Sequence, residues 1–337
     1  MSTSTFKAVI LAGGSGERFW PLSTPERPKQ FLRVFGGASL IRQAVSRLDG
    51  LVSPKDVFVV TAKNLVAATR RELPEIPKCN ILGEPMRRDT GAAVALGVGL
   101  AAGSAADPVI GFFSSDQMVA NPKAFRKVVS KAVALARRKS VIVTLGIKPT
   151  YLATCFGYIS PKTRTFVEKP DAKTAKKYVK AGYLWNAGMF IARASTFRGA
   201  FAAHAPELER LTSSTRAAGS KAPSTKHLFA LYSKLPKISF DYAVMEKSKN
   251  VEVVPGDFGW DDVGSFAAFD KYFPHDSRGN VREGPCTVVE ADGNICVARS
   301  ARISLLGVKN LVVVTTPDSV LVADKSRLTD MKKLFKK

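Results

Sequence analysis

The sequence predicts an α/β protein in which helices cover both faces of a largely parallel sheet. Four almost continuously apolar runs, rich in β-branched residues, indicate the strands: 8–11, 57–60, 109–113 and 141–145. Strands of this composition are buried on both faces, as in parallel sheets. Stretches of helical composition alternate with them at 40–48, 92–102 and 122–138. The alternation indicates a doubly wound sheet, and Asn121 before Pro122 is a typical cap and first-turn pair.

The middle third of the chain interrupts this alternation. Strand-like segments at 165–168 and 189–192 flank a helix-like segment at 172–181, and residues 212–227 are rich in Ser, Thr, Ala and Gly. The composition of 212–227 favours a surface loop. We expect the region to be an insertion that walls a pocket on the same domain.

A different pattern begins at about residue 274, where short strand-like runs follow one another with little helix. The runs are 286–290, 295–298, 303–306, 311–314 and 320–322, with Gly, Asn and Asp at the turns. We therefore predict two domains, 1–273 and a small all-β domain at 274–337 that ends in a basic helix at 326–337. Its apolar strands are a plausible surface for contact between the two copies of a homodimer.

Length and composition fit a globular protein of about two domains, at ~150 residues each. The 337 residues are 45% hydrophobic and 23% charged, which excludes a disordered chain. No apolar run reaches the ~18 residues that span a bilayer, so we expect no membrane partner. The N-terminal segment lacks the order of a signal peptide and fits a first strand, which favours a cytoplasmic protein.

The net charge of +23 comes from basic residues dispersed over helix-like stretches, without interleaved aromatics or a nucleic-acid-binding motif. We interpret them as solvated faces that also attract small anionic substrates, and expect no nucleic-acid partner. A nucleic-acid binder remains an alternative, and its binding would fall steeply with salt. The cysteines are not spaced as metal ligands are, and each lies in or beside an apolar segment. We therefore expect buried free thiols at Cys79, Cys155, Cys286 and Cys296.

The most informative segment is the glycine-rich stretch after the first strand, LAGGSGERFWPLSTPERPKQF at residues 11–31. The free backbone N–H groups of such a loop can bind phosphates at the carboxyl edge of an α/β sheet. Phe19 replaces the third glycine of the dinucleotide fingerprint, and no Gly-Lys-Ser/Thr of a nucleoside-triphosphatase loop follows. Instead, Arg18 and Lys29 supply two cations that can reach a triphosphate over the loop.

The segment from Gly13 to Phe31 resembles the signature of the sugar-1-phosphate nucleotidylyltransferases, and its details are similar to the mannose-1-phosphate guanylyltransferases. Six further motifs match that family in order and spacing, at 84–90, 144–151, 166–170, 184–190, 241–247 and 259–265. The C-terminal strands resemble the short β-helical domain of the same enzymes. The resemblance implies a Rossmann-like nucleotide-diphospho-sugar transferase domain with a mixed, mostly parallel sheet, plus this small C-terminal β-helical domain.

The resemblance also implies a reaction, in which GTP and mannose 1-phosphate give GDP-mannose and pyrophosphate. The sugar phosphate would attack the α-phosphorus of GTP in line, so the protein must position two anions and offset their repulsion. The isomerase domain of bifunctional relatives has no counterpart before Lys337, so we expect a monofunctional enzyme.

Two acids are candidates for a metal site. Asp116 follows an apolar strand, and Asp262 lies in a turn-rich segment. A bare carboxylate ~4 Å from a phosphate charge would cost ~4 kcal/mol at an effective dielectric constant of ~20, so two acids at phosphates need a cation between them. Oxygen ligands and a triphosphate suit Mg²⁺. The family pattern favours Asp262 over its neighbour Asp261 as the second ligand.

The resemblance assigns roles to further residues. Arg18, Lys29 and Lys169 are the expected catalytic cations, the first two on the β- and γ-phosphates and Lys169 on the sugar phosphate. The nucleotide would be bordered by Gly13, Gly14, Ser15, Gly16, Glu84, Arg88, Thr90 and Asp116. The sugar would be bound by Gly157, Glu168, Lys169, Asn186 and Asp261.

Several positions depart from the family pattern, and they leave the base and the hexose open. Asp89 stands where asparagine is usual, Gln117 where histidine is common, and Gly91-Ala92-Ala93 where Ala-Pro-Ala is typical. Near the sugar, Leu152, Ala153 and Cys155 replace the expected Pro-Glu and glycine. The alternatives are therefore a nucleotidylyltransferase for another sugar 1-phosphate, such as a heptose or glucose type, or another base, and a catalytically silent sugar-nucleotide sensor.

Overall fold

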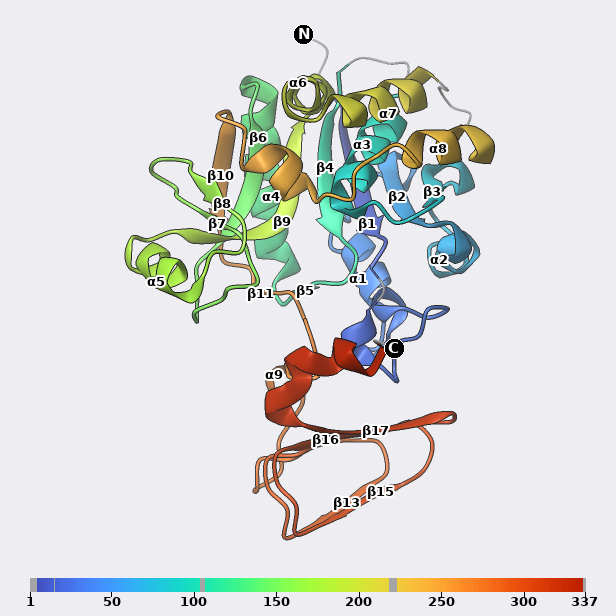
Figure 1. Cartoon of the computed structure of the whole chain (residues 1–337), viewed down its shortest axis with the longest axis vertical. Coiled ribbons are helices and arrows are strands. Elements are labelled where there is room, and N and C mark those ends of the chain that lie inside the picture. Colours follow the sequence, from blue (N-terminus) through green and yellow to red (C-terminus); the bar gives the residue numbers. More distant parts are fainter. Residues whose placement is uncertain (1–4, 15, 104–106, 218–222, 336–337) are drawn as a thin grey trace. The chain divides into compact units, whose positions relative to one another are not determined.

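The computed structural model describes residues 5–14, 16–103, 107–217 and 223–335. The chain forms two compact units (Figure 1). Unit 1 consists of Met1–Gly13, Arg42–Ser115 and Val119–Trp260. Unit 2 consists of Gly14–Ile41, Asp116–Met118 and Asp261–Lys337. The glycine-rich segment after the first strand therefore folds with the C-terminal residues.

A mixed nine-stranded sheet, counted over the described residues, forms the centre of unit 1. Its main path is β10-β6-β9-β4-β1-β2-β3, with β7 and β8 off this path. The strands are β1 (Phe6–Ala12), β2 (Val57–Ala62), β3 (Ile81–Glu84), β4 (Val109–Ser114), β6 (Ile142–Ile147), β7 (Tyr158–Ile159), β8 (Phe166–Val167), β9 (Leu184–Arg193) and β10 (Val251–Gly256). Along the main path, neighbours pair in parallel except β9, which is antiparallel to β4 and β6. Off this path, β7 is antiparallel to both β8 and β9. The mostly parallel sheet is thus confirmed.

Helices cover both faces of this sheet. The helices of this part of the chain are α1 (Leu40–Ser46), α2 (Val66–Glu72), α3 (Asp89–Ala102), α4 (Pro122–Arg138), α5 (Ala172–Lys180), α6 (Ala194–His204), α7 (Pro206–Ala217) and α8 (Thr225–Tyr232). Neighbouring residues of a strand point to opposite faces. Phe112 of β4 packs edge-on against Phe197 of α6, and Phe113 packs against Phe125 of α4. The predicted cap of α4 is confirmed, because the Asn121 side chain accepts a hydrogen bond from Ala124 N.

The prediction of a surface loop at 212–227 is wrong for the described part of that stretch; residues 218–222 lie outside it. Helix α7 continues to Ala217, and α8 begins after Ser224, whose side chain caps it. Thr212 is fully buried and donates its hydroxyl to the carbonyl of Ala95 in α3. The hydroxyl residues therefore cap one helix and pack another against α3, roles that composition alone does not distinguish from a loop.

Unit 2 folds the glycine-rich segment onto a small β-domain. Its strands are β12 (Val281–Glu283), β13 (Cys286–Val289), β14 (Ile295–Ala298), β15 (Ile303–Leu306), β16 (Leu311–Thr316) and β17 (Ser319–Asp324), and α9 (Ala268–Tyr272) precedes them. The strands pair in parallel between successive turns, except for the antiparallel pair β16 and β17. Phe19 and Phe35 are buried with Phe269 and Val312 in one core cluster. The C-terminal β-strand domain of the predicted fold is confirmed, and its bounds at 274–337 stay a prediction.

Short elements complete the chain. These are the 3-10 helices η1 (Glu17–Phe19), η2 (Lys29–Phe31), η3 (Pro54–Asp56), η4 (Lys63–Leu65), η5 (Lys78–Asn80) and η7 (Lys325–Phe335), the π-helix η6 (Asp241–Met245), and the two-residue strands β5 (Met118–Val119) and β11 (Trp260–Asp261). The basic C-terminal helix predicted at 326–337 is η7, which is a 3-10 helix as far as the structure describes it.

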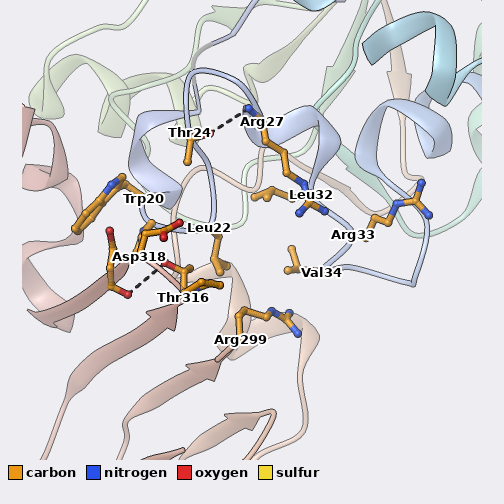
Figure 2. A pocket seen from close by; sticks show the side chains of 13 residues that line it. Trp20, Leu22, Thr24, Arg27, Leu32, Arg33, Val34, Arg299, Thr316 and Asp318 are labelled. Atoms are coloured by element: carbon orange, nitrogen blue, oxygen red, sulfur yellow. Dashed lines mark hydrogen bonds between the residues drawn. The ribbon is translucent and has the colours of Figure 1, made fainter. Parts of the chain in front are cut away.

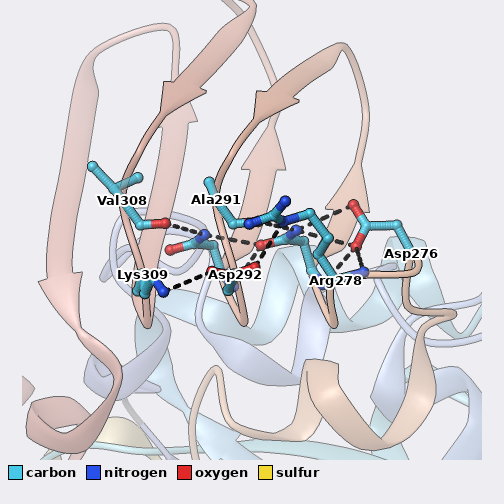
Figure 3. Close-up of polar contacts among 8 residues, drawn as sticks. Asp276, Arg278, Ala291, Asp292, Val308 and Lys309 are labelled. Carbon is cyan, nitrogen blue, oxygen red and sulfur yellow. Dashed lines mark hydrogen bonds and ion pairs between the residues drawn. The ribbon is translucent and has the colours of Figure 1, made fainter.

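Buried asparagines connect the turns of the β-domain. Asn294 is fully buried and donates from Nδ2 to Asn280 Oδ1 at 2.9 Å and to the Val308 carbonyl at 3.2 Å. Along the same turns, Arg278 Nε donates to Asp292 Oδ1 at 2.7 Å (Figure 3). Each turn is thus held to the next by side-chain hydrogen bonds, because a buried amide must find partners for its donors and acceptor.

The four cysteines differ in their exposure to solvent. None of the four cysteines forms a disulfide bond. Cys296 is buried as predicted and Cys286 is partly buried, but Cys79 and Cys155 are exposed, so their predicted burial is wrong. Both lie outside the regular strands, Cys79 in η5, which precedes β3, and Cys155 in the segment before β7. Within the ranges that the structure describes, no helix has the length and apolar character needed to cross a membrane.

Candidate active site

Unit 2 contains a pocket of about 190 Å³ whose lining is dominated by charged and glycine residues. The lining residues are Gly14, Gly16, Glu17, Arg18, Phe19, Lys29, Asp116, Gly264 and Lys332. Three of these side chains are cationic and two are acidic. The small volume and the exposed glycine backbone suit phosphate groups rather than a whole nucleotide.

Lys29 is the best-fixed side chain of this pocket. It lies at the start of η2 and is only 5% exposed. Its Nζ lies 3.0 Å from Asp116 Oδ2 and 2.8 Å from the backbone oxygen of Asp262. A buried ammonium needs such partners, and they hold it beside both acids predicted from the sequence. The structure therefore brings Lys29, Asp116 and Asp262 together.

Gly16 makes room for this lysine. Its φ of +66° lies in the left-handed region, which side chains other than glycine rarely adopt. A Cβ at Gly16 would lie 2.5 Å from the backbone nitrogen of Lys29 and 2.6 Å from its Cβ. The third glycine of the loop is thus required by the close approach of Lys29. Ser15, predicted to contact the nucleotide, lies outside the described residues.

Asp116 and Asp262 are close enough to each other to act together on a metal ion. Burial raises the pKa of Asp262, the nearby Lys29 lowers it, and the charge of Asp116 raises it again. The two carboxylates are therefore close enough to repel each other. Over the part of the chain that the structure describes, no group of three or more His, Cys, Asp or Glu side chains could hold a metal by itself. Two carboxylates fit Mg²⁺, which takes its remaining ligands from substrate phosphates and water.

Unit 1 contains a larger pocket, of about 490 Å³, at the carboxyl ends of the parallel strands β1, β2 and β3. It is lined by Gly13, Ala62, Lys63, Asn64, Glu84, Pro85, Met86 and Arg87. This edge is where open α/β sheets bind their ligands. A Cβ at Gly13 would lie 3.3 Å from Glu84 Oε2, so the glycine leaves this carboxylate accessible from β1.

Glu84 is an unusual acid. Burial raises its pKa to about 7, although the Tyr232 hydroxyl donates a hydrogen bond to Oε1 at 3.1 Å. Two other predicted nucleotide residues have structural partners. Arg88 donates to the carbonyls of Tyr232 and Ser233 at the end of α8, and the Thr90 hydroxyl accepts from the Phe240 backbone. These contacts fix the wall around Glu84.

A second charged cluster of unit 1 surrounds Glu168. The side chain of Glu168 is 8% exposed, and its Oε1 lies 3.1 Å from Lys169 Nζ, whose side chain is 51% exposed. A Cβ at Gly157 would lie 2.5 Å from Glu168 Oε2, so this glycine is needed to admit the carboxylate. Lys169 has a positive φ of +45°, which is uncommon for a lysine and is tolerated at functional positions.

The amide of Asn186 is oriented by its neighbours. Its Oδ1 accepts from the Thr144 hydroxyl at 2.7 Å, and its Nδ2 donates to Asp241 Oδ1 at 2.9 Å. Burial, together with the nearby charge of Glu168, raises the pKa of Asp241 to about 7. The structure thus joins three predicted sugar residues, Glu168, Lys169 and Asn186, to an acid that the sequence analysis did not single out.

Comparison with known proteins now bears on this arrangement. The family model for nucleotidyl transferases matches residues 7–278, and the model for the MannoseP isomerase/GMP-like beta-helix domain matches residues 284–337. A mannose-1-phosphate guanylyltransferase of Salmonella typhimurium is 35% identical, over 98% of this chain and 72% of the relative. The chain belongs to the mannose-1-phosphate guanylyltransferase family of nucleotidyl transferases.

Two further relatives of this family agree. The mannose-1-phosphate guanylyltransferase of Escherichia coli K12 is 34% identical over 99% of this chain and 73% of its own. A Thermus thermophilus crystal structure titled mannose-1-phosphate geranyltransferase superposes with a TM-score of 0.88, at 34% identity over 98% of both chains.

The departures from the guanylyltransferase pattern have local explanations in part. Asp89 has a φ of +64°, a conformation in which Asp and Asn are the best tolerated side chains after glycine. A Cβ at Gly91 would lie 2.7 Å from the Ile238 carbonyl, which explains the glycine there. Leu152 and Cys155 are exposed, whereas Gln117 is buried. Nothing in the structure explains Leu152 or Cys155.

Asp261 was predicted to bind the sugar of the guanylyltransferase reaction. It belongs to unit 2, where its Oδ2 lies 2.6 Å from Lys271 Nζ and its Oδ1 accepts from the Val263 backbone. These contacts give the carboxylate a structural role, and its contact with the sugar stays a prediction.

Unit 2 also has a cavity of about 600 Å³ away from the predicted residues. Arg27, Arg33 and Arg299 lie around it with the indole of Trp20 (Figure 2). Arg299 pairs with Glu283 at 3.1 Å. No motif of the guanylyltransferase family predicted this cavity.

The sequence analysis did not single out three groups of residues at these sites. Lys63 and Asn64 directly follow β2. Their position at the carboxyl end of a predicted parallel strand could have indicated that they line a ligand pocket. Asp241 begins one of the matched motifs, but its partner Asn186 is distant in sequence. Lys332 comes from the basic C-terminal segment, and no sequence pattern connects it to the glycine-rich loop.

Proposed function

We propose that this chain transfers GMP from GTP to mannose 1-phosphate and releases GDP-mannose and pyrophosphate. The observation that carries the proposal is the contact of Lys29 Nζ with Asp116 and with the backbone of Asp262, in a pocket lined by the glycine-rich loop. This cluster combines cations for phosphates with two oxygen donors for a metal. The named activities of the relatives support the choice of GTP and mannose 1-phosphate.

Arg18 and Lys29 act on the triphosphate. A Cβ at Gly264 would lie 3.2 Å from both Arg18 Nη1 and Asp262 Oδ2, so the guanidinium and the acid face the same point. Arg18 can hold the outer phosphates by charge-assisted hydrogen bonds, and Lys29 is already fixed in place. Both offset the charge that accumulates on pyrophosphate as it departs, without reorganisation at the moment of reaction.

Asp116 and Asp262 would hold Mg²⁺. When bound, the ion would neutralise phosphate charge and favour attack at the α-phosphorus. Lys29 would then fix the Asp116 carboxylate through its 3.0 Å contact, and it would keep the two acids from repelling each other.

Lys169 and Glu168 act on the sugar phosphate. The exposed ammonium of Lys169 is anchored to Glu168 at 3.1 Å and is available to the phosphate of the sugar. Glu168 and the Asn186–Asp241 pair offer acceptors to sugar hydroxyls. Holding the attacking phosphate in this way converts a bimolecular encounter into a positioned reaction.

Glu84 is the candidate for reading the base. Guanine presents its N1–H and its 2-amino group side by side, and a carboxylate can accept from both. A pKa of about 7 means that guanine binding would favour loss of the Glu84 proton. Inosine triphosphate lacks the 2-amino group, so wild type should prefer GTP over inosine triphosphate. Glu84→Gln should show a smaller preference between these two nucleotides.

The function is tested by pyrophosphate release from purified protein with Mg²⁺, GTP and mannose 1-phosphate. UTP and dTTP in place of GTP, and glucose 1-phosphate in place of the mannose compound, are the controls. Release should require GTP and mannose 1-phosphate. Faster release with another nucleotide or sugar phosphate would overturn the proposed substrates.

We also infer a cytoplasmic homodimer, since the reaction consumes GTP and the β-domain exposes apolar side chains. Leu306 is 72% exposed, and Val320 and Val322 are each more than 60% exposed. Light scattering of wild type and Leu306→Lys tests the contact. A monomeric wild type at micromolar concentration would contradict it.

A further inference from the structure

The phosphate pocket of unit 2 contains a cation that comes from the far end of the chain. Lys332 lies in η7 and lines the same pocket as Gly16, Arg18 and Lys29. More than 300 residues separate it from that loop in the sequence. Its place is therefore a product of tertiary folding within unit 2.

Buried and aromatic contacts hold η7 against the glycine-rich segment. Leu328 and Met331 are each 3% exposed and belong to the same core cluster as Phe19, the neighbour of Arg18. Phe335 packs edge-on against Trp20, with 5.9 Å between ring centroids. In Figure 1 the red C-terminal segment lies beside the blue loop that carries these residues. Apolar anchors on both sides of Lys332 thus fix its backbone at the pocket.

The ammonium group of Lys332 is available to bind an anion. In the stretch 16–335, apart from the gaps at 104–106 and 218–222, it makes no ion pair or hydrogen bond. Its neighbour Lys333 points to a different partner, with Nζ 3.0 Å from Asp330. Lys29 is already bound to Asp116. Lys332 is therefore an available positive charge for an anion in the pocket.

We propose that Lys332 is a further substrate-binding residue of this enzyme, which contacts the outer phosphates of GTP and the pyrophosphate product. The inference rests on the proposed function for the identity of the anion. The ammonium adds a charge to those of Arg18 and Lys29 where a highly charged leaving group must be stabilised. It also makes the C-terminal segment a part of the phosphate site.

The test compares Lys332→Met with Lys333→Met in the full chain. In the reverse reaction, Lys332→Met should raise the KM for pyrophosphate about tenfold, since one exposed charge-assisted contact is lost. Lys333→Met should stay within about twofold of wild type, because it changes the net charge equally but removes a group that pairs with Asp330 and does not line the pocket. Lys332→Arg should recover most of the affinity. In the forward reaction, the KM for the sugar phosphate should stay unchanged in all three variants.

Direct titration separates this inference from the proposed function. Binding of pyrophosphate and of GTP with Mg²⁺ is measured by calorimetry without any sugar phosphate, so it does not depend on which sugar reacts. Weaker binding in Lys332→Met alone, with an unchanged Tm, supports the role even if mannose 1-phosphate is not the substrate. Equal losses in both variants, or no loss in either, would overturn it.

Discussion

Replacing Gly16 by alanine should damage both the stability of unit 2 and the reaction. The left-handed backbone of Gly16, at a φ of +66°, costs a residue with a Cβ about 1–2 kcal/mol. The new methyl would also meet the backbone nitrogen of Lys29 at 2.5 Å, and relieving such overpacking costs about 1–3 kcal/mol. We expect a loss of about 3 kcal/mol, or roughly 6–12 °C in Tm.

The same change should displace Lys29. Because Lys29 Nζ lies 3.0 Å from Asp116 and 2.8 Å from the Asp262 carbonyl, a shift of its backbone alters the whole cluster. A displacement of ~1 Å at a catalytic group can cost ~10²-fold in rate, so kcat/KM should fall by about that factor.

Gly14→Ala is the matched control. A Cβ at Gly14 would meet nothing within 4 Å, and its backbone is not in the left-handed region. Its Tm should therefore stay within about 2 °C of wild type, as for a surface substitution. Thermal unfolding and pyrophosphate release on both variants decide the point. A Gly16→Ala protein that melts like Gly14→Ala and turns over like wild type would refute the reasoning.

Four further outcomes are expected. Asn294→Ala should cost about 3–5 kcal/mol in urea unfolding, because it removes two or more buried hydrogen bonds of a fully buried side chain; a change below about 1 kcal/mol contradicts the assigned contacts. Lys169→Ala should raise the KM for the sugar phosphate at least tenfold more than the KM for GTP, and equal increases would reject the clamp role. The KM of wild type for the sugar phosphate should rise as the pH passes about 7, because Asp241 then loses its proton and adds negative charge beside Glu168. In Asp241→Asn the KM should change less than in wild type between pH 6 and 8. Parallel pH profiles of the two proteins would contradict this role of Asp241. Asp116→Ala and Asp262→Ala should each abolish Mg²⁺-dependent release while the Tm stays within a few degrees, and near-normal activity in either would end that ligand assignment.

The parts of the fold that depend on local pattern could be predicted from the sequence. The apolar run at 57–60 became β2, and Asn121-Pro122 begins α4 at the predicted residue. Such features follow from burial on both faces and from cap chemistry, which need only near neighbours in sequence. The glycine-rich loop was recognisable for the same reason.

Features that depend on distant contacts could not be predicted. Thr212 can lie in a helix packed against α3 because Gly99 of α3 has no side chain. A Cβ at Gly99 would lie 2.7 Å from the Thr212 carbonyl oxygen. Asp241 matters because it meets Asn186, 55 positions away. Lys332 reaches the phosphate pocket only because Met331 is buried beneath the loop. In each case the composition of the segment predicted a solvated side chain or one without a specific role, whereas tertiary packing gives the residue a specific role.

The reaction to be tested is the transfer of GMP from GTP to mannose 1-phosphate, with release of pyrophosphate. The most direct measurement is pyrophosphate release with Mg²⁺ and GTP, with mannose 1-phosphate present, omitted or replaced by glucose 1-phosphate. We expect release that requires mannose 1-phosphate, with GDP-mannose as the second product. Release that is equal without the sugar phosphate, or that occurs only with glucose 1-phosphate, would contradict it.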